Sequence, residues 1–409
     1  MTQLSPGALT ALLALMGLLN AFASDLFIPA LPATTADLGV TPLQAQQTVS
    51  LFFVACAFMS LWHGALADAY GRRRTILAAL AVLGASSIGC FLAAKIGQLW
   101  GLRVLQGMAA GSGLVISRAI VIDLYTGAAA QHLLSRILMI QTASLMVVPM
   151  IGGWLTIAFG WRSIFIAIFG ITLLLGLANW RWLPETLPPH KRHSLHPVLL
   201  WRSYRQVLTS GTFLRLSLAH VANWTSMTTY VVAAPALVIR LMERSAADIW
   251  LVYAPIALGL LAGFWIFPRV VRRLAAAPAL ALAYGILGLA VVFNLAVCWL
   301  LPPGLFHLVP LFVYSAGMAL ALPLLVDRAL VRLRSRTGVA SSCQTFLQFA
   351  MMGVAAGLLA PLLWDSALML ALGTGCLTAL GALSLLWERH VRSTAVVPSA
   401  QISAAPERS

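Results

Sequence analysis

The chain has 409 residues, of which 61% are hydrophobic and only 9% are charged. Roughly a quarter of the residues of a water-soluble protein are charged, so this composition excludes a soluble globular protein and indicates a membrane protein. The formal net charge of +15 could suggest a nucleic-acid partner. The basic residues, however, gather in the segments between apolar stretches, and we expect no nucleic-acid binding.

Twelve apolar stretches follow one another along the chain, each near the roughly 20 residues that a helix needs to cross a bilayer. They occupy residues 8–30, 47–67, 75–93, 97–122, 137–157, 163–183, 213–238, 247–267, 279–301, 305–326, 338–361 and 367–387. The runs are continuous rather than alternating, which excludes the strands of an outer-membrane barrel. The sequence therefore predicts an all-α polytopic membrane protein with twelve transmembrane helices.

The basic residues of the loops lie mainly on one side of the predicted membrane. On the other side the loops carry only Lys95, Arg162, Arg240 and Arg244. Because positive charge resists translocation, both termini are predicted to be cytoplasmic, in a bacterial inner membrane. The letters "AFAS" before Asp25 resemble a signal-peptidase site, but a basic n-region is missing and cleavage would invert every later loop.

A Pro-rich, basic segment divides the stretches into six and six. We predict a six-helix bundle over 1–183, a cytoplasmic central loop over 184–212 with an amphipathic helix near 195–209, a second six-helix bundle over 213–388, and a disordered cytoplasmic tail over 389–409. Equivalent segments of the two halves are weakly similar, for example "GALADAYGRRRT" and "FPRVVRRLAAAP". Such internal repeats are typical of secondary transporters, whose binding site lies between the repeats. His190, His193 and His196 of the central loop could bind a metal, but the surrounding Lys, Arg and Pro favour a solvated basic loop, and we expect no metal site.

Asp25 is the one acidic residue that falls within the predicted hydrocarbon region. An ionisable group there is costly and usually functional. Arg103 lies at a matching depth on the fourth stretch, at 1.5 Å per helical residue, and we interpret it as the counter-charge of Asp25. The alternative for each is a side chain that snorkels to the interface.

The segment "GALADAYGRRRT" between the second and third stretches combines glycines, an acid and three arginines. We expect Gly71 to form a tight turn, and Asp68 with Arg72 and Arg73 to make salt bridges that depend on conformation. An ordinary basic loop would explain the arginines alone, but not the whole pattern with Gly64.

Several other polar, aromatic or methionine side chains lie within the apolar stretches and could line a substrate cavity, although ordinary helix packing would also explain them. They are Asn20, Met146, Asn223, Tyr230, Tyr253, Tyr314, Gln344 and Gln348. The five cysteines also fall within these stretches and are interpreted as small core residues. No zinc, phosphate-loop or nucleophile-elbow motif is present, so we predict no enzyme and no ATP-driven transport.

"GALADAYGRRR" resembles the loop signature of the major facilitator superfamily, and "RVLQG" (Arg103 to Gly107) resembles its helix-4 motif. "SLMVVPMIGG" is similar to the helix-5 motif of its proton antiporters, and "DLFIPALP" to the start of drug:proton antiporters of the Bcr/CflA and MdfA type. Two positions depart from the pattern: Val148 replaces a glycine of the helix-5 motif, and Ile122 replaces an arginine before the helix-4 acid.

The resemblance implies roles for individual residues. Asp25 would be the protonation and coupling site, and Arg103 would respond to its charge. Asp68 would lie against the start of helix 11, and Arg72 would pair with Asp123 and lock the outward-facing form. Pro149, Gly152 and Gly153 would shape helix 5 against helix 8 and limit leakage.

The leading hypothesis is a monomeric inner-membrane exporter that exchanges protons for small lipophilic drugs by alternating access, with no cofactor beyond the proton gradient. A single membrane acid suggests one proton per cycle as the simplest case. Two alternatives stay open: a proton-coupled uptake symporter for a metabolite, and a membrane receptor or scaffold that transports nothing.

Overall fold

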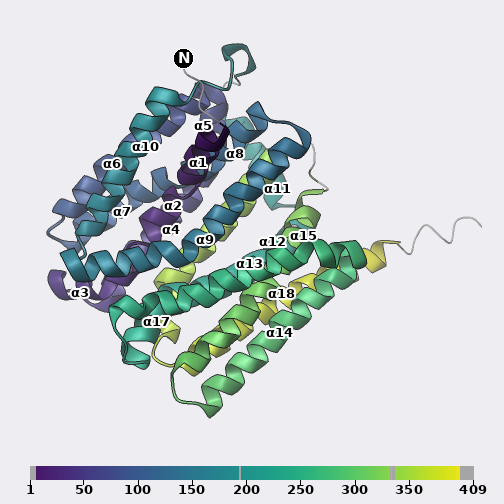
Figure 1. The fold of residues 1–409 in the computed structure, drawn as a ribbon. Coiled ribbons are helices and arrows are strands. Elements are labelled where there is room, and N and C mark those ends of the chain that lie inside the picture. The colour runs from purple at the N-terminus through teal and green to yellow at the C-terminus, as the bar shows by residue number, and fades with distance from the viewer. Residues whose placement is uncertain (1–5, 193–194, 332, 334–336, 397–409) are drawn as a thin grey trace, which may run out of the picture.

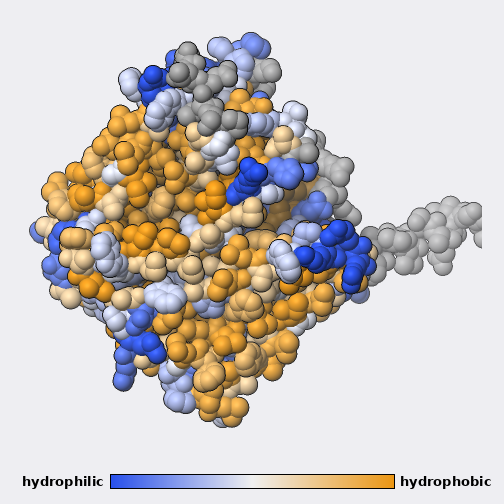
Figure 2. Space-filling model, in the orientation of Figure 1, coloured by the Kyte–Doolittle hydropathy of each residue, from blue (hydrophilic) through white to orange (hydrophobic). Residues whose placement is uncertain are grey.

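The structure is a computed structural model that describes residues 6–192, 195–331, 333 and 337–396. Every regular element in these residues is a helix, and the long helices gather into two groups (Figure 1). Hydrophobic side chains cover most of the face shown in Figure 2, and hydrophilic ones gather mainly at helix ends and loops. This surface is what a lipid-embedded protein requires.

The first group of helices runs from the N-terminus to Trp182. Its elements are α1 (Pro6–Gly17), α2 (Leu19–Ser24), η1 (Ile28–Ala30), α3 (Leu31–Leu38), α4 (Pro42–Ser60), α5 (His63–Tyr70), α6 (Arg72–Leu92), α7 (Ile96–Ala110), α8 (Ser112–Leu124), α9 (Gly127–Phe159) and α10 (Ser163–Trp182). Within this group α4 packs on α7, and α6 packs on α7 and α10.

The second group begins at Gly211. Its elements are α12 (Gly211–Pro235), η3 (Ala236–Leu241), η4 (Ala246–Ile249), α13 (Trp250–Arg273), α14 (Ala276–Leu300), η5 (Leu305–Leu308), α15 (Val309–Val331), α16 (Thr337–Val354), η7 (Ala355–Leu359), α17 (Ala360–Leu363) and α18 (Ala367–Val396). Here α15 packs on α13 and α14, and α18 packs on α12. The helix α18 continues past Glu388 to Val396, so the beginning of the segment predicted as a disordered tail is helical.

Between the groups lie η2 (Pro189–Lys191) and α11 (Pro197–Leu208), the latter where an amphipathic helix was predicted. Tyr204 and Val207 of α11 are buried, and the Tyr204 hydroxyl donates a hydrogen bond to the carbonyl oxygen of Leu61 in the first group. His193 of the predicted histidine trio lies outside the described residues.

Nine helices among the described residues are long and apolar enough to cross a membrane, or up to eleven if each of two bent pairs counts as one span. Of the twelve predicted stretches, 213–238 is the one that does not match any of these spans in the described residues. It forms the helix α12, but Arg215, His220, Asn223 and several Ser and Thr residues lower its hydropathy. Most of these polar side chains are buried against neighbouring helices, which explains how such a sequence can lie in the interior.

Both bent pairs lie at the start of the chain. The axis turns by 43° between Gly7–Gly17 and Leu19–Leu38, and by 48° between Pro42–Ser60 and His63–Tyr70. Discontinuous helices are common at the binding sites of transporters, where unwound backbone is tolerated because protein or water covers it. The first break lies a few residues before Asp25.

The two groups touch mainly where α4 meets α16 and η7, and where α9 meets η4 and α13. In Figure 1 the groups meet near α3 and α17 and diverge towards the end at which α1 and α5 lie. We name the two ends by residues: the Pro42 end, where α4 begins, and the Gly71 end, where α5 meets α6.

Candidate functional site

Asp25 follows the last residue of α2, directly before the turn that leads into η1. It is 9% exposed, and the Ser24 hydroxyl donates a hydrogen bond to its Oδ1 atom at 2.9 Å. In the described part of the chain, Asp25 takes part in no ion pair. The carboxyl group is therefore enclosed by protein without a cation to balance a negative charge.

Tyr253 of the second group lies near Asp25. It lies on α13, is 1% exposed, and its hydroxyl is within electrostatic range of the Asp25 carboxylate. That hydroxyl has no hydrogen-bond partner in the structure. Asp25 therefore lies near the boundary between the two groups, with an unused donor in its surroundings.

Two glycines of α9 bring this helix close to the same region. A Cβ on Gly152 would lie 2.2 Å from the carbonyl oxygen of Leu26, and one on Gly153 would lie 3.2 Å from that of Ala246 in η4. Gly152 thus packs on the first helical segment beside Asp25, while Gly153 packs on the segment that leads into α13. Pro149 is buried inside α9 one turn earlier.

Arg103 is fully buried on α7, but it does not contact Asp25 as the sequence suggested. Its Nη1 atom donates to the carbonyl oxygen of Ala23 and to Oε1 of Gln106, both at 2.7 Å. Its guanidinium carbon lies 4.4 Å from the ring centre of Phe52 and 5.0 Å from that of Phe27.

The predicted Asp25–Arg103 ion pair is therefore wrong for this structure. Ala23 and Asp25 lie on either side of Ser24 in the chain, so the Ala23 carbonyl and the Asp25 side chain leave the helix in different directions. Arg103 holds the backbone just before Asp25, and its Nε and Nη2 atoms have no hydrogen-bond partner.

The predicted pair between Arg72 and Asp123 is confirmed, with Nε and Oδ2 3.2 Å apart. Arg72 also forms an ion pair with Asp68, four residues earlier. The side chains of Arg72 and Asp123 are only 9% and 19% exposed, so this pair is largely shielded from solvent, whereas the side chain of Asp68 is 47% exposed. Residues 334–336, directly before α16, lie outside the described residues, and the predicted contact of Asp68 with the start of helix 11 falls there.

Gly71 makes the tight turn that the sequence predicts, with a φ of 98°. A Cβ there would also lie 2.3 Å from Oε2 of Glu185, whose Oε1 accepts a hydrogen bond from the backbone nitrogen of Arg72 at 2.9 Å. Arg73 donates to the carbonyl oxygen of Trp180. A Cβ on Gly64, by contrast, would meet nothing within 4 Å.

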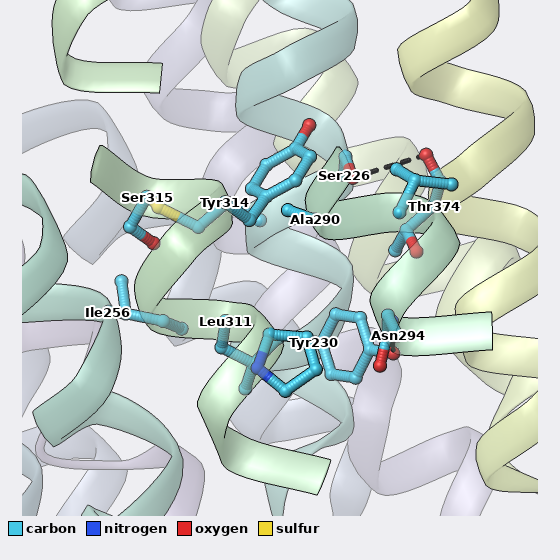
Figure 3. Close-up of a pocket in the computed structure, with 12 residues that line it drawn as sticks. Ser226, Tyr230, Ile256, Ala290, Asn294, Leu311, Tyr314, Ser315 and Thr374 are labelled. Carbon is cyan, nitrogen blue, oxygen red and sulfur yellow. Dashed lines mark hydrogen bonds between the residues drawn. The ribbon is translucent and has the colours of Figure 1, made fainter. Parts of the chain in front are cut away.

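A small pocket inside the second group contains two of the predicted cavity residues, Tyr230 and Tyr314. Its lining comes from α12, α13, α14, α15 and α18 (Figure 3). Asn294 donates to the Tyr230 hydroxyl at 2.6 Å, and Ser226 donates to the Thr374 carbonyl at 3.4 Å. The pocket offers about 10 Å³ to the centre of a water molecule, which is room for a single water and not for a drug.

The other predicted cavity residues are scattered through both groups. Asn223 is buried and donates to the Tyr284 hydroxyl at 3.1 Å, while half-buried Asn20 reaches the Cys56 sulfur at 3.7 Å. Gln344 is buried with its Nε2 atom unpartnered, and Met146 is half-buried on α9. Gln348 is half-buried on α16.

Sequence reasoning missed the residues that join the two groups at the Pro42 end. Ser50 of α4 donates to the carbonyl oxygen of Gly353 at 2.8 Å, and Gln47 donates to that of Gly357 at 3.0 Å. The letters "GVAAG" from Gly353 to Gly357 carried the signal, because two glycines four residues apart in an apolar helix are typical of a close helix contact.

A buried carboxylate at a break in the first of many apolar helices is typical of secondary transporters. The sequence model of the Major Facilitator Superfamily matches residues 13–356 of the chain, and the chain belongs to that superfamily. It is a multi-pass membrane transporter rather than an enzyme, as the sequence predicts.

Curated relatives include drug-resistance proteins. The chain is 35% identical over 187 residues to the uncharacterised MFS-type transporter YdgK of Bacillus subtilis, a match that spans 45% of this chain and 46% of the relative. It is 27% identical over 329 residues to a chloramphenicol resistance protein of Pseudomonas aeruginosa, across 80% of this chain and 77% of the relative.

A solved structure of the peptide transporter POT, in a mutant form in complex with sulfate, has the same fold. The TM-score is 0.75 over 93% of this chain and 94% of that chain, at 15% identity.

Proposed function

We propose that the chain is a proton-coupled antiporter that exports small lipophilic compounds by alternating access. The observation that carries the proposal is Asp25: a lone carboxylate, enclosed by protein, with no cation paired to it among the described residues. Such a group can take up a proton when it is enclosed and lose it when water or a cation reaches it. The drug-resistance relative supports drugs as the substrate class.

In the proposed architecture, α12 also crosses the membrane and brings the number of spans to twelve. The two groups are then six-helix bundles over 1–183 and 213–388. Both termini and the 184–212 loop face the cytoplasm of a bacterial inner membrane, which places the Gly71 end inside and the Pro42 end outside. The transporter works as a monomer, and the proton gradient is its energy source.

In the proposed cycle, drug and proton compete for the region around Asp25. A proton arriving from the outside releases the drug, and loss of that proton to the inside prepares the site for the next molecule. Arg103 acts on this region through the backbone of Ala23, which it holds just before Asp25. Asp68, Arg72 and Asp123 form the ion-paired part of the gate at the inner end, and Arg73 belongs to the gate through its bond to the Trp180 carbonyl.

The test is proton release when drug binds to purified protein in weakly buffered detergent, with chloramphenicol as the first probe. We expect about one proton per bound drug from the wild type and none from Asp25→Asn. Asp37→Asn is the matched control, since Asp37 forms an ion pair with Arg162 near the Pro42 end and should leave the release intact.

Drug binding to the wild type without proton release contradicts the proposal. If the compound enters proteoliposomes in the same direction as the protons, and not in the opposite direction, the protein is instead an uptake symporter.

A further inference from the structure

The end of α13 carries three exposed arginines on one side of the helix. Arg269, Arg272 and Arg273 are spaced three and four residues apart, which makes their side chains neighbours on the helix surface. None of them takes part in an ion pair in the described part of the chain. Like charges at this spacing repel one another, so an anion bound between them would stabilise this end of the helix.

The three arginines border an open hollow of about 690 Å³. Val270 and Leu274 complete its lining among the described residues. Figure 2 shows hydrophilic side chains gathered at this end of α13, directly beside the hydrophobic surface of the second group. The hollow therefore offers positive charge next to a surface that contacts lipid.

Two of the guanidinium groups are held in place by their own helix. Nη1 of Arg269 donates to the carbonyl oxygen of Trp265 at 2.8 Å, and Nε of Arg272 donates to that of Pro268 at 3.1 Å. Each of these bonds uses one of the five N–H donors of a guanidinium group. The donors that remain suit the oxygens of a phosphate, which arginine binds in pairs.

Trp265 places the hollow at the surface of the membrane. Its side chain is 66% exposed, and the guanidinium carbon of Arg269 lies 3.8 Å from its ring centre. Tryptophan is enriched at the level of the lipid headgroups. The 24 residues of α13 make it about 36 Å long, slightly more than the roughly 30 Å of hydrocarbon in a bilayer, so its last turn emerges among the headgroups.

The next helix adds backbone donors at the same turn. α14 begins at Ala276, its N-cap residue Ala275 makes no side-chain bond, and the residues of its first turn are exposed. Free N–H groups at the start of a helix favour a bound anion. Arg389 of α18 donates to the carbonyl oxygen of Ala277 at 3.3 Å and brings a fourth cation to this turn.

We propose that Arg269, Arg272 and Arg273, together with the first turn of α14, bind the headgroup phosphate of an anionic phospholipid. The acyl chains of this lipid lie along the exposed apolar side chains of α13 beside Trp265. The preference of basic residues for the cytoplasmic side explains arginines in this turn. It does not explain the hollow, the stacking of Arg269 on Trp265 or the uncapped start of α14.

The test is lipid binding to the delipidated full-length protein, counted by native mass spectrometry as phosphatidylglycerol or phosphatidylcholine is added. Both lipids carry a phosphate, but only phosphatidylglycerol has a net negative charge. We expect the wild type to bind its first phosphatidylglycerol about tenfold more tightly than phosphatidylcholine, and Arg272→Gln/Arg273→Gln to lose this preference. Glutamine and arginine have similar helix propensities, so this variant should fold.

Two further variants serve as controls. Arg272→Lys/Arg273→Lys keeps both charges and should keep most of the preference for phosphatidylglycerol. Arg240→Gln/Arg244→Gln removes two positive charges from the second group at the Pro42 end, where Arg240 forms an exposed ion pair with Asp365. It should bind phosphatidylglycerol as the wild type does.

An unchanged preference in Arg272→Gln/Arg273→Gln, or an equal loss in Arg240→Gln/Arg244→Gln, would overturn the proposed lipid site. Displacement of the bound lipid by inorganic phosphate would identify a site for soluble phosphate and would overturn it as well. The measurement uses neither drug nor proton gradient, so its outcome is independent of the antiport proposal.

Discussion

Gly71→Ala should destabilise the protein strongly, whereas Gly64→Ala in the same motif should not. Gly71 has φ 98° and ψ 153°, a conformation essentially confined to glycine that costs another residue about 1–3 kcal/mol. The new methyl group would also displace the Glu185 carboxylate, whose bond to the Arg72 backbone nitrogen is of the kind worth about 1.5–3 kcal/mol. At the lower ends of these ranges, the loss is already about 2.5 kcal/mol.

Gly64 provides the internal comparison. It lies inside α5, and a methyl group added there would meet no other atom within 4 Å. Replacing a helical glycine by alanine stabilises by roughly 0.5–1 kcal/mol. The free energy of unfolding of both variants in mixed micelles is the measurement. Equal losses in the two variants, or a loss under about 1 kcal/mol for Gly71→Ala, would refute the steric argument.

The further predictions concern buried polar groups. Tyr204→Phe should free α11 by leaving the Leu61 carbonyl unpaired, at about 1–2 kcal/mol, and should be seen as faster trypsin cleavage within α11. Burial raises the pKa of Tyr204 from 10.0 to about 12, so its hydrogen bond should be intact below pH 10 and lost as the pH rises through 12. Ser315→Ala should be neutral or slightly stabilising in thermal unfolding, because the Ser315 hydroxyl is buried without a partner, whereas Asn294→Leu should cost about 1–2 kcal/mol by removing the donor to Tyr230.

The backbone conformation of a turn and the pairing of nearby charges could be predicted from the sequence, because each depends on few neighbouring residues. Gly71 could be predicted from the tight turn between two apolar stretches, and its φ confirms it. The pairing of Arg72 with Asp123 was implied by the resemblance to the superfamily, and the structure contains this pair. Membership of the superfamily followed from the same resemblance and is confirmed.

The directions in which side chains point could not be predicted from the sequence. Depth along a helix places Asp25 and Arg103 at one level, but only the packing of α7 on α2 decides that Arg103 meets the Ala23 carbonyl instead of the carboxylate. Likewise, Tyr230 and Tyr314 are polar residues on apolar helices, and only the packing of five helices decides that they enclose a pocket for one water.

The sequence by itself determined that the chain is a helical membrane protein of this superfamily, because the bilayer constrains hydropathy and charge along the chain. It also determined that Asp25 is the one acid within the predicted hydrocarbon region. Only the tertiary structure decided which surfaces of the two groups meet. The close contact of Ser50 with Gly353 and Gly357 joins residues about 300 positions apart, and in the membrane such contacts arise from shape and hydrogen bonding rather than from hydrophobicity.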